Sequence, residues 1–147
     1  MTEQVKIQRL HPDAKLPTYG SAAAAGADLY ALLDAPLTVE PGRTVLVRTG
    51  IALALPLGTV GLVFARSGLA TRRGLAPANK VGVIDADYRG EVMVALHNHS
   101  DAPATVEIGE RIAQLVIVPY VTADFLAVDA LDETERGAGG FGSTGRQ

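Results

Sequence analysis

Short runs of apolar residues, broken every few positions by glycine, proline or aspartate, dominate the hydrophobic pattern of this chain. One run alternates with a period of two: Val92, Val94 and Leu96 fall on one face of an extended strand, and the residues between them fall on the other. We predict strands at 5–10, 27–33, 43–55, 59–64, 91–98, 104–108 and 111–119. Many short strands separated by frequent turns predict an all-β sandwich or barrel.

One segment departs from the strand pattern. Ser67 can cap the N-terminus of a short helix at 68–73, because its side-chain oxygen can accept a hydrogen bond from a free backbone N–H. Gly74 follows the last helical position, where a glycine commonly ends a helix. We therefore predict a single short helix near 67–73.

The C-terminal residues are different in composition from the rest. From Arg136 onward the chain is rich in glycine and has one bulky apolar side chain, Phe141. Such a segment buries too little apolar surface to offset the entropy of ordering it. We predict a core domain at 1–135 and a mobile C-terminal arm at 136–147 that orders only when something holds it.

Composition and charge limit the function classes. The 147 residues fit one domain, and the net charge of −3 argues against general binding of nucleic acid, which needs a basic surface. The most apolar segment, 51–65, is interrupted by Pro56 and Gly58 and is shorter than the roughly 20 residues of a membrane span. The absence of cysteine fits a reducing compartment, and we expect a cytoplasmic protein.

The glycine-rich tail spells G-x-G-x-x-G from residue 137, but a dinucleotide site needs a strand before this motif and a helix after it, so that interpretation is rejected. What remains is Arg136 followed by a flexible loop with two hydroxyls, Ser143 and Thr144. Successive backbone N–H groups of such a loop can bind an anion, and the arginine can add a bidentate contact to phosphate. The alternative is a disordered tail without a function.

A second candidate site lies where a strand gives way to the helix. Arg66 and Ser67 stand beside free N–H groups and the positive end of the helix dipole, which favour an anion. The alternative is an ordinary serine cap beside a solvated arginine.

A third candidate follows the apolar run 81–84. Asp85 comes directly after this run, so it is expected to be partly desolvated, and a carboxylate in a cleft can act as general base for a water. Tyr88 offers a flat face to a ring or a sugar. Calcium is excluded, because Arg89 and Leu96 occupy positions where an EF-hand needs oxygen ligands. The alternative is a tight turn with aspartate side chains.

Three polar residues interrupt otherwise apolar strands elsewhere. Asp28 could orient water around a metal ion or simply begin a strand. Arg111 and Gln114 could each face a phosphate or the solvent.

These separate segments form one pattern when they are taken in order. The chain contains AGADLYA, ARSGLA, GVIDADYRGEV, ERIAQLVI and RGAGGFGSTG, and together they resemble the five motifs of the trimeric dUTP pyrophosphatase (dUTPase) family. The resemblance implies a distorted jelly-roll (a β-clip barrel) assembled as a homotrimer. It also implies active sites shared between subunits, with the arm of one subunit closing over a site formed by the other two.

The resemblance also implies roles for individual residues. Asp85 would be the general base, Tyr88 would pack on the deoxyribose and exclude a 2′-hydroxyl, and Asp28 would hold a water of a Mg²⁺ ion bound mainly by the triphosphate. The uracil pocket would be formed by Asn79, Gly82, Val83, Ile84 and Met93. The phosphate ligands would be Arg66, Ser67, Gly68 and Gln114. In the arm, the substrate would be bound by Arg136, Phe141, Gly142, Ser143 and Thr144. The implied reaction is hydrolysis of dUTP to dUMP and pyrophosphate.

Two alternatives remain after the resemblance. The first is a dCTP deaminase, or a bifunctional deaminase and dUTPase, of the same fold. In that family the arginine-serine motif typically continues with a second serine, whereas this chain has Gly68. The second is a non-catalytic nucleotide-binding regulator, because a fold does not by itself fix a function.

Overall fold

The computed structural model describes residues 4–141, and these residues form eleven β-strands and one helix. The strands are β1 (Lys6–Arg9), β2 (Thr18–Tyr19), β3 (Ala27–Tyr30), β4 (Leu37–Val39), β5 (Thr44–Ala54), β6 (Thr59–Phe64), β7 (Leu75–Pro77), β8 (Gly82–Ile84), β9 (Glu91–Asn98), β10 (Ala104–Val106) and β11 (Arg111–Pro119). The helix α1 spans Ser67–Arg73. The predicted all-β architecture with one short helix is confirmed.

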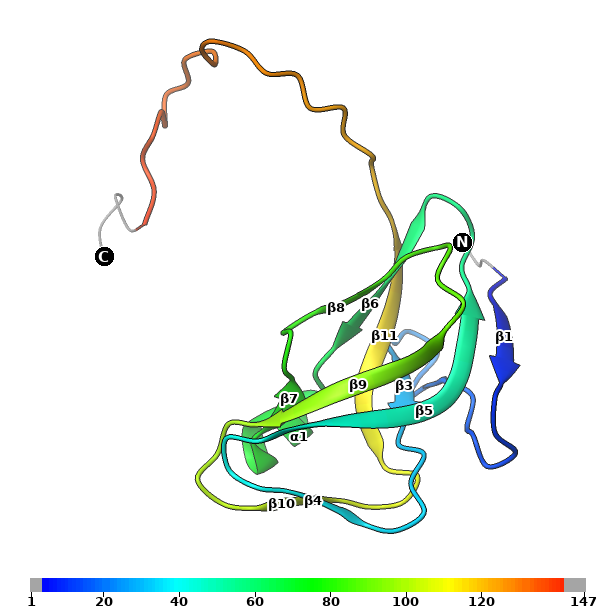
Figure 1. Cartoon of the computed structure of the whole chain (residues 1–147). Helices are drawn as coiled ribbons and strands as arrows, with labels where there is room; N and C mark the ends of the chain where they lie inside the picture. Colours follow the sequence, from blue (N-terminus) through cyan, green and yellow to red (C-terminus); the bar gives the residue numbers. More distant parts are fainter. Residues whose placement is uncertain (1–3, 142–147) are drawn as a thin grey trace.

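The strands form three antiparallel sheets. A four-stranded sheet has the order β1-β5-β9-β7, a five-stranded sheet has the order β2-β3-β11-β6-β8, and β10 pairs with β4. In Figure 1, β5 and β9 of the first sheet cross in front of β6 and β11 of the second. Strands that are neighbours in space are mostly distant in sequence, as in a jelly-roll.

The hydrophobic core fills the space between the sheets. Along β9 the alternating residues Val92, Val94 and Leu96 are 3%, 2% and 0% exposed, as the period-two pattern predicted. Leu29 of β3 and Ile112 of β11 belong to the same core cluster. Burial of one face of each sheet fixes the register of the strands, because a shift by one residue would move the apolar set to the solvent side.

The helix ends as predicted but does not begin as predicted. Gly74 has a φ of 69°, and its N–H donates to the carbonyl of Leu69, which closes the last turn. The N-cap residue is Arg66 rather than Ser67, and no side chain caps the helix, so the predicted serine cap is wrong. Ser67 already lies within the helix, where its carbonyl accepts from the Thr71 hydroxyl. No helix within residues 4–141 has both the length and the apolar character needed to cross a bilayer.

Long strands were predicted more accurately than short ones. The strands at 59–64, 91–98 and 111–119 have the predicted bounds, whereas those predicted at 27–33 and 104–108 end earlier, at Tyr30 and Val106. The predicted strands omit β2, β4, β7 and β8, which have only two or three residues each. So few positions cannot establish an alternating pattern, and these strands are recognised only through their pairing with another strand.

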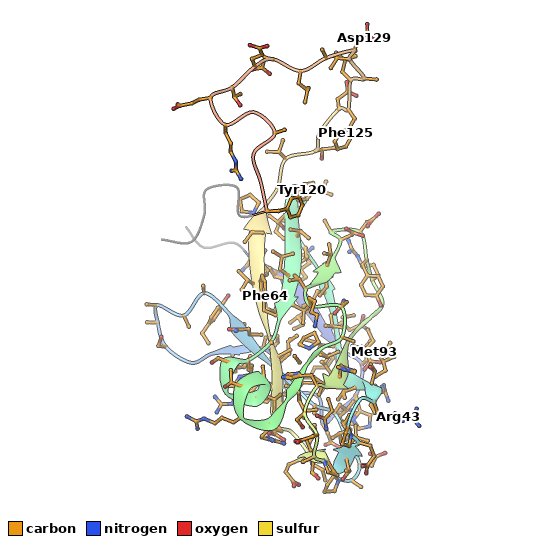
Figure 2. All side chains as sticks on the ribbon, turned by 90° about the vertical axis from the view of Figure 1, so that its left-hand side faces the viewer. Arg43, Phe64, Met93, Tyr120, Phe125 and Asp129 are labelled. Carbon is orange, nitrogen blue, oxygen red and sulfur yellow. The ribbon has the colours of Figure 1, made fainter. Side chains whose placement is uncertain are left out.

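Beyond β11 the chain leaves the sheets. The described residues 120–141 contain no strand or helix, and Figures 1 and 2 show this segment, with Phe125 and Asp129, extending away from the barrel. Several of its apolar side chains are almost fully exposed, including Val121 and Phe125 at 93% and Leu131 at 84%. Residues 142–147 lie outside the described part of the chain. The division into a core at 1–135 and an arm at 136–147 stays a prediction.

Candidate active site

A cavity of about 360 Å³ opens between β8 and β9. It is lined by Leu46, Val63, Pro77, Asn79, Gly82, Val83, Ile84, Asp85, Tyr88, Glu91, Val92, Met93, Val94 and Ala95. The volume suits a small organic ligand, and the lining combines apolar walls with a few polar groups, as in most ligand pockets. All seven residues predicted between Asn79 and Met93 line this one cavity.

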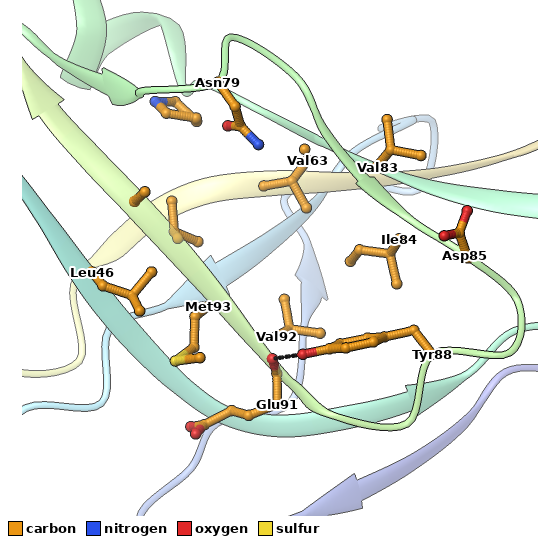
Figure 3. A pocket seen from close by; sticks show the side chains of 14 residues that line it. Leu46, Val63, Asn79, Val83, Ile84, Asp85, Tyr88, Glu91, Val92 and Met93 are labelled. Carbon is orange, nitrogen blue, oxygen red and sulfur yellow. Dashed lines mark hydrogen bonds between the residues drawn. The ribbon is translucent and has the colours of Figure 1, made fainter.

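The two ends of the cavity differ in chemistry. Figure 3 shows Asn79 at one end, and Asp85 with Tyr88 at the other. Between them runs β8, which pairs with β6 along Gly82–Ile84. Ile84 is buried, whereas Val83 is 65% exposed. The cavity therefore presents an amide side chain at one end, and a carboxylate beside an aromatic ring at the other.

Asp85 begins the turn between β8 and β9. Its backbone carbonyl accepts from the Tyr88 N–H at 3.1 Å, which closes the turn. Its side chain is exposed, so the predicted partial desolvation is wrong for the single chain. Among residues 4–141 no ion pair involves Asp85, and its carboxylate is open to a water molecule.

Tyr88 stands at the same end of the cavity. Its hydroxyl donates to the backbone carbonyl of Glu91 at 3.0 Å, as Figure 3 shows. The Glu91 carboxylate is itself held by Arg48 Nε at 3.1 Å and by the Gly50 N–H at 2.8 Å. The tyrosine ring is thus hydrogen-bonded to the first residue of β9, whose side chain is itself bound by Arg48 and Gly50.

A second group of polar residues, here called the polar cluster, lies outside this cavity. It consists of Asp28, Arg66, Arg73, Glu110 and Arg111. Asp28 is 8% exposed and accepts from Arg66 Nε at 2.7 Å and from Arg111 Nη1 at 3.3 Å. Arg73 donates to Glu110 and to the carbonyl of Thr105. Three cations and two anions leave one positive charge in excess, which favours an anionic ligand.

Burial and the neighbouring cations act in opposite directions on Glu110. Partial burial by itself raises the pKa of Glu110, but hydrogen bonds from Arg73 and from the backbone N–H of Glu107, together with the charges of Arg73 and Arg66, lower the pKa below its ordinary value. The carboxylate therefore stays charged in the folded chain at mildly acidic pH.

The five-stranded sheet separates the polar cluster from the cavity. Gln114 of β11 is paired with Asp28 of β3 and with Phe64 of β6, so these three residues point to one face. The next pair along, Leu115 and Val63, points to the opposite face, and Val63 lines the cavity. In one chain the two groups of predicted site residues are therefore on opposite faces of a sheet.

The remaining predicted residues are distributed between these places and the extension. Gln114 donates from Nε2 to the carbonyl of Ala65 at 2.8 Å, which holds it beside the loop that leads to the helix. Ser67 and Gly68 are exposed at the start of that helix. Arg136 and Phe141 lie in the extension, away from the cavity, and Arg136 donates to the carbonyl of Gly139. The predicted residues Gly142, Ser143 and Thr144 lie outside the described residues.

The donors present fit a magnesium ion held by phosphate rather than a metal cage. Within residues 4–141, no three His, Cys, Asp or Glu side chains gather as a metal site. Both oxygens of Asp28 accept from arginines, yet a carboxylate has further lone pairs for a metal-bound water. Mg²⁺ keeps several waters and is usually bound through one or two carboxylates together with substrate phosphates.

The predicted site omitted several residues that the structure brings together. Arg111 was recognised only as a residue facing phosphate or solvent, because it lies three positions from Gln114 and only a register shift in β11 brings it to the side of Asp28. Arg73 and Glu110 had no local signal at all, since the chain separates them by 37 positions. Leu46 and Val63 line the cavity from strands whose apolar pattern indicates only a core.

The chain is similar to known proteins over nearly its full length. The family model described as dUTPase matches residues 12–145. The deoxyuridine 5′-triphosphate nucleotidohydrolase of Desulfitobacterium hafniense is 54% identical over 145 residues, which is 97% of this chain and 96% of that protein. The enzyme of the same name from Syntrophotalea carbinolica is 51% identical, with 98% of each chain covered.

Solved structures give the same result. The dUTPase of Staphylococcus bacteriophage 80alpha with dUPNHPP has a TM-score of 0.89 and 29% identity, covering 99% of this chain and all of that one. A mutant dUTPase from phage phi11 of S. aureus, described as revealing the coordination of a structural Mg(II) ion, has a TM-score of 0.77 and 25% identity, covering 87% and 98%. The motifs, the all-β jelly-roll and the near-complete matches agree, and the chain belongs to the dUTPase family.

Proposed function

We propose that this enzyme hydrolyses dUTP to dUMP and pyrophosphate, which limits uracil in DNA and supplies dUMP for dTMP synthesis. The observation that carries the proposal is the cavity between β8 and β9, which combines a base-sized apolar space with Asn79, Tyr88 and an exposed Asp85. Membership of the dUTPase family supports the same reaction.

Uracil is bound at the Asn79 end of the cavity. Gly82, Val83 and Ile84 offer backbone groups along β8, and Met93 adds an apolar contact from β9. A narrow pocket of this kind rejects the 5-methyl group of thymine by overlap. Cytosine carries a donor where uracil has an acceptor, so it would leave buried groups unpaired, which is costly.

The deoxyribose packs on Tyr88, and the α-phosphate lies near Asp85. Asp85 takes a proton from a water, and the oxygen of that water attacks the α-phosphorus while the bond to the β-phosphate bridge oxygen breaks. The products are dUMP and pyrophosphate. The exposed position of Asp85 supports this role, because its carboxylate can reach a water without first leaving an ion pair.

The polar cluster and the start of the helix bind the triphosphate. Arg66, Ser67, Gly68 and Gln114 act as phosphate ligands, and the excess positive charge around Asp28 supports this assignment. Asp28 would hold a water of a bound Mg²⁺ ion, because its carboxylate has lone pairs beyond those that accept from the arginines. When bound, Mg²⁺ supplies charge neutralisation at the phosphate oxygens.

The site is completed by neighbouring copies of the chain in a homotrimer. A single subunit has the cavity on one face of the five-stranded sheet and Gln114 with Asp28 on the other, so one triphosphate cannot contact both groups of the same subunit. The exposed apolar side chains of the extension support a docking surface on another subunit. The arm residues Arg136, Phe141 and 142–144 then close over the ligand and exclude water.

The test is release of pyrophosphate from dUTP, dTTP, dCTP and UTP, with and without Mg²⁺, with ammonia measured in parallel. We expect magnesium-dependent pyrophosphate from dUTP and little from the other three. Ammonia from dCTP would instead support the deaminase, and binding of dUTP without turnover would support a regulator.

A further inference from the structure

We propose that Gly90 sets the sugar specificity of this site, by leaving the space that the Tyr88 ring needs to lie across the end of the cavity. This inference rests on the proposed function and deepens it. Gly90 does not line the cavity and would act only through the tyrosine, so it is a positioning residue.

The space at Gly90 is occupied by the tyrosine. A Cβ atom at position 90 would lie 2.4 Å from the Tyr88 hydroxyl oxygen, 2.6 Å from Cζ and 2.9 Å from Cε2. Real Cβ atoms do not approach other heavy atoms this closely, so any side chain at position 90 must displace the ring. The φ angle of Gly90 is outside the left-handed region, and the backbone itself would accept alanine. The requirement for glycine is therefore steric.

The hydroxyl end of the ring is also held by a hydrogen bond. The Tyr88 hydroxyl donates to the carbonyl of Glu91 at 3.0 Å, which Figure 3 shows at the end of the cavity. The Glu91 side chain accepts from the Gly50 N–H at 2.8 Å and from Arg48 at 3.1 Å, where the pairing of β5 with β9 shifts register. The carbonyl that holds the tyrosine thus belongs to a strand end that is itself anchored.

A fixed ring discriminates between sugars better than a mobile one. A tyrosine side chain has two rotatable bonds, and a ring free to turn would move aside for a ribose 2′-hydroxyl. The space at Gly90 admits the ring and the bond to the Glu91 carbonyl holds the ring there, so the extra hydroxyl of a ribose would clash with it. Steric differences of one group in a pocket typically change specificity by about 10- to 200-fold.

The first experiment measures kcat/KM for dUTP and for UTP in the unmodified protein and in Gly90→Ala. We expect the dUTP/UTP ratio to fall roughly tenfold in Gly90→Ala, mainly through improved use of UTP. Gly20→Ala is the matched control, because a Cβ at Gly20 would have no heavy atom within 4 Å and the ratio should not change. An unchanged ratio in a folded Gly90→Ala protein would overturn the proposal.

The second experiment asks whether the effect passes through the tyrosine. In a Tyr88→Ala background the obstructing ring is gone, so adding Gly90→Ala should leave the ratio within about twofold of Tyr88→Ala alone. If Gly90→Ala lowers the dUTP/UTP ratio roughly tenfold in the Tyr88→Ala background as well, Gly90 does not act through the tyrosine ring. If Gly90→Ala does not fold, Tyr88→Phe replaces it: the ring remains without its bond to Glu91, and the ratio should fall about threefold. A ratio equal to that of the unmodified protein would again overturn the proposal.

The controls separate this inference from the function on which it rests. An unmodified protein that does not hydrolyse dUTP would remove the proposed function itself. An unmodified protein that hydrolyses dUTP selectively, with the same selectivity in Gly90→Ala and Tyr88→Phe, would remove only the role of Gly90.

Discussion

The cavity and the polar cluster each contain one aspartate of the predicted site, and the two aspartates have opposite surroundings. Asp85, in the turn after β8, is exposed and belongs to no ion pair within residues 4–141. Asp28, in the middle of β3, is 8% exposed and is bound by two arginines. Two residues of the same type can thus have different roles. A carboxylate open to water can accept a proton, whereas a buried carboxylate between cations positions those cations for a ligand.

The two groups of predicted site residues also lie on opposite faces of one sheet in the single chain. The paired residues Gln114 and Asp28 face away from Val63, which lines the cavity. Under the proposed function, a triphosphate that needs both an activated water and several arginines would contact the second group on another copy of the chain. The exposed apolar residues beyond β11 support the same interpretation.

The comparison is tested most strongly at Asp85. Asp85→Asn removes the proton acceptor without disturbing an ion pair, so we expect kcat for dUTP to fall roughly 10³-fold with little change in thermal stability. Steady-state kinetics and a melting curve measure the two effects. Asp87→Asn, the same change two residues later at an exposed position, is the control and should retain activity. Comparable losses in both variants would show that the turn, rather than the carboxylate of Asp85, matters.

Removal of the arm tests whether activity needs the arm in addition to the cavity and the polar cluster. A chain that ends at Glu135 should be roughly 100-fold less active, because no arm closes over the bound ligand. Its melting temperature should not change, since residues 120–141 are largely exposed and the core cluster lies before them. Full-length protein in the same assay is the reference. Normal turnover by the truncated chain would remove the lid from the proposed mechanism.

Substitution of Asp28 should affect stability as well as activity. Asp28→Asn leaves Arg66 and Arg111 without their shared anion, and we expect a loss of about 2–3 kcal/mol in the free energy of unfolding. Urea unfolding measures this loss, and Asp34→Asn, at an exposed position, should cost almost nothing. If Asp28→Asn is as stable as the unmodified protein, the ion pairs of Asp28 do not contribute to the free energy of unfolding.

The smallest effect is expected at Glu110, at the edge of the polar cluster. Its folded-state pKa lies below the ordinary value of 4.5, so its stabilising contribution is present above that pH and is lost as the pH falls through the folded-state pKa. Glu110→Gln should reduce the free energy of unfolding by about 1 kcal/mol at pH 7. The difference from the unmodified protein should shrink below pH 4.5. A constant difference across the pH range would contradict the ion pair with Arg73.

Much of the cavity was visible in the sequence because its residues are neighbours in the chain. Asp85, Tyr88 and the strand before them occupy one short segment, and β9 follows with a clear period of two. Local spacing determines which of these side chains share a face. The family motifs added roles that no single pattern supplied.

The polar cluster was only partly predictable, because its contacts join distant segments. Asp28 of β3 meets Arg111 of β11 and Arg66 of the loop before the helix, and no local pattern distinguishes that aspartate from one at an ordinary strand start. The start of the helix was also predicted incorrectly. Ser67 has a good capping side chain, but the helix begins one residue before the predicted first position.

The sequence by itself determined the all-β class, the long strands and the short helix with its glycine end, because each depends on spacing within one segment. The resemblance to the family, rather than spacing, supplied most of the residues around the cavity. Only the tertiary structure decided which strands are neighbours, which aspartate is buried between arginines, and that the two groups of site residues lie on opposite faces of one sheet. Pairing between distant strands depends on the burial of whole faces, and that free energy belongs to the assembled core rather than to any one segment.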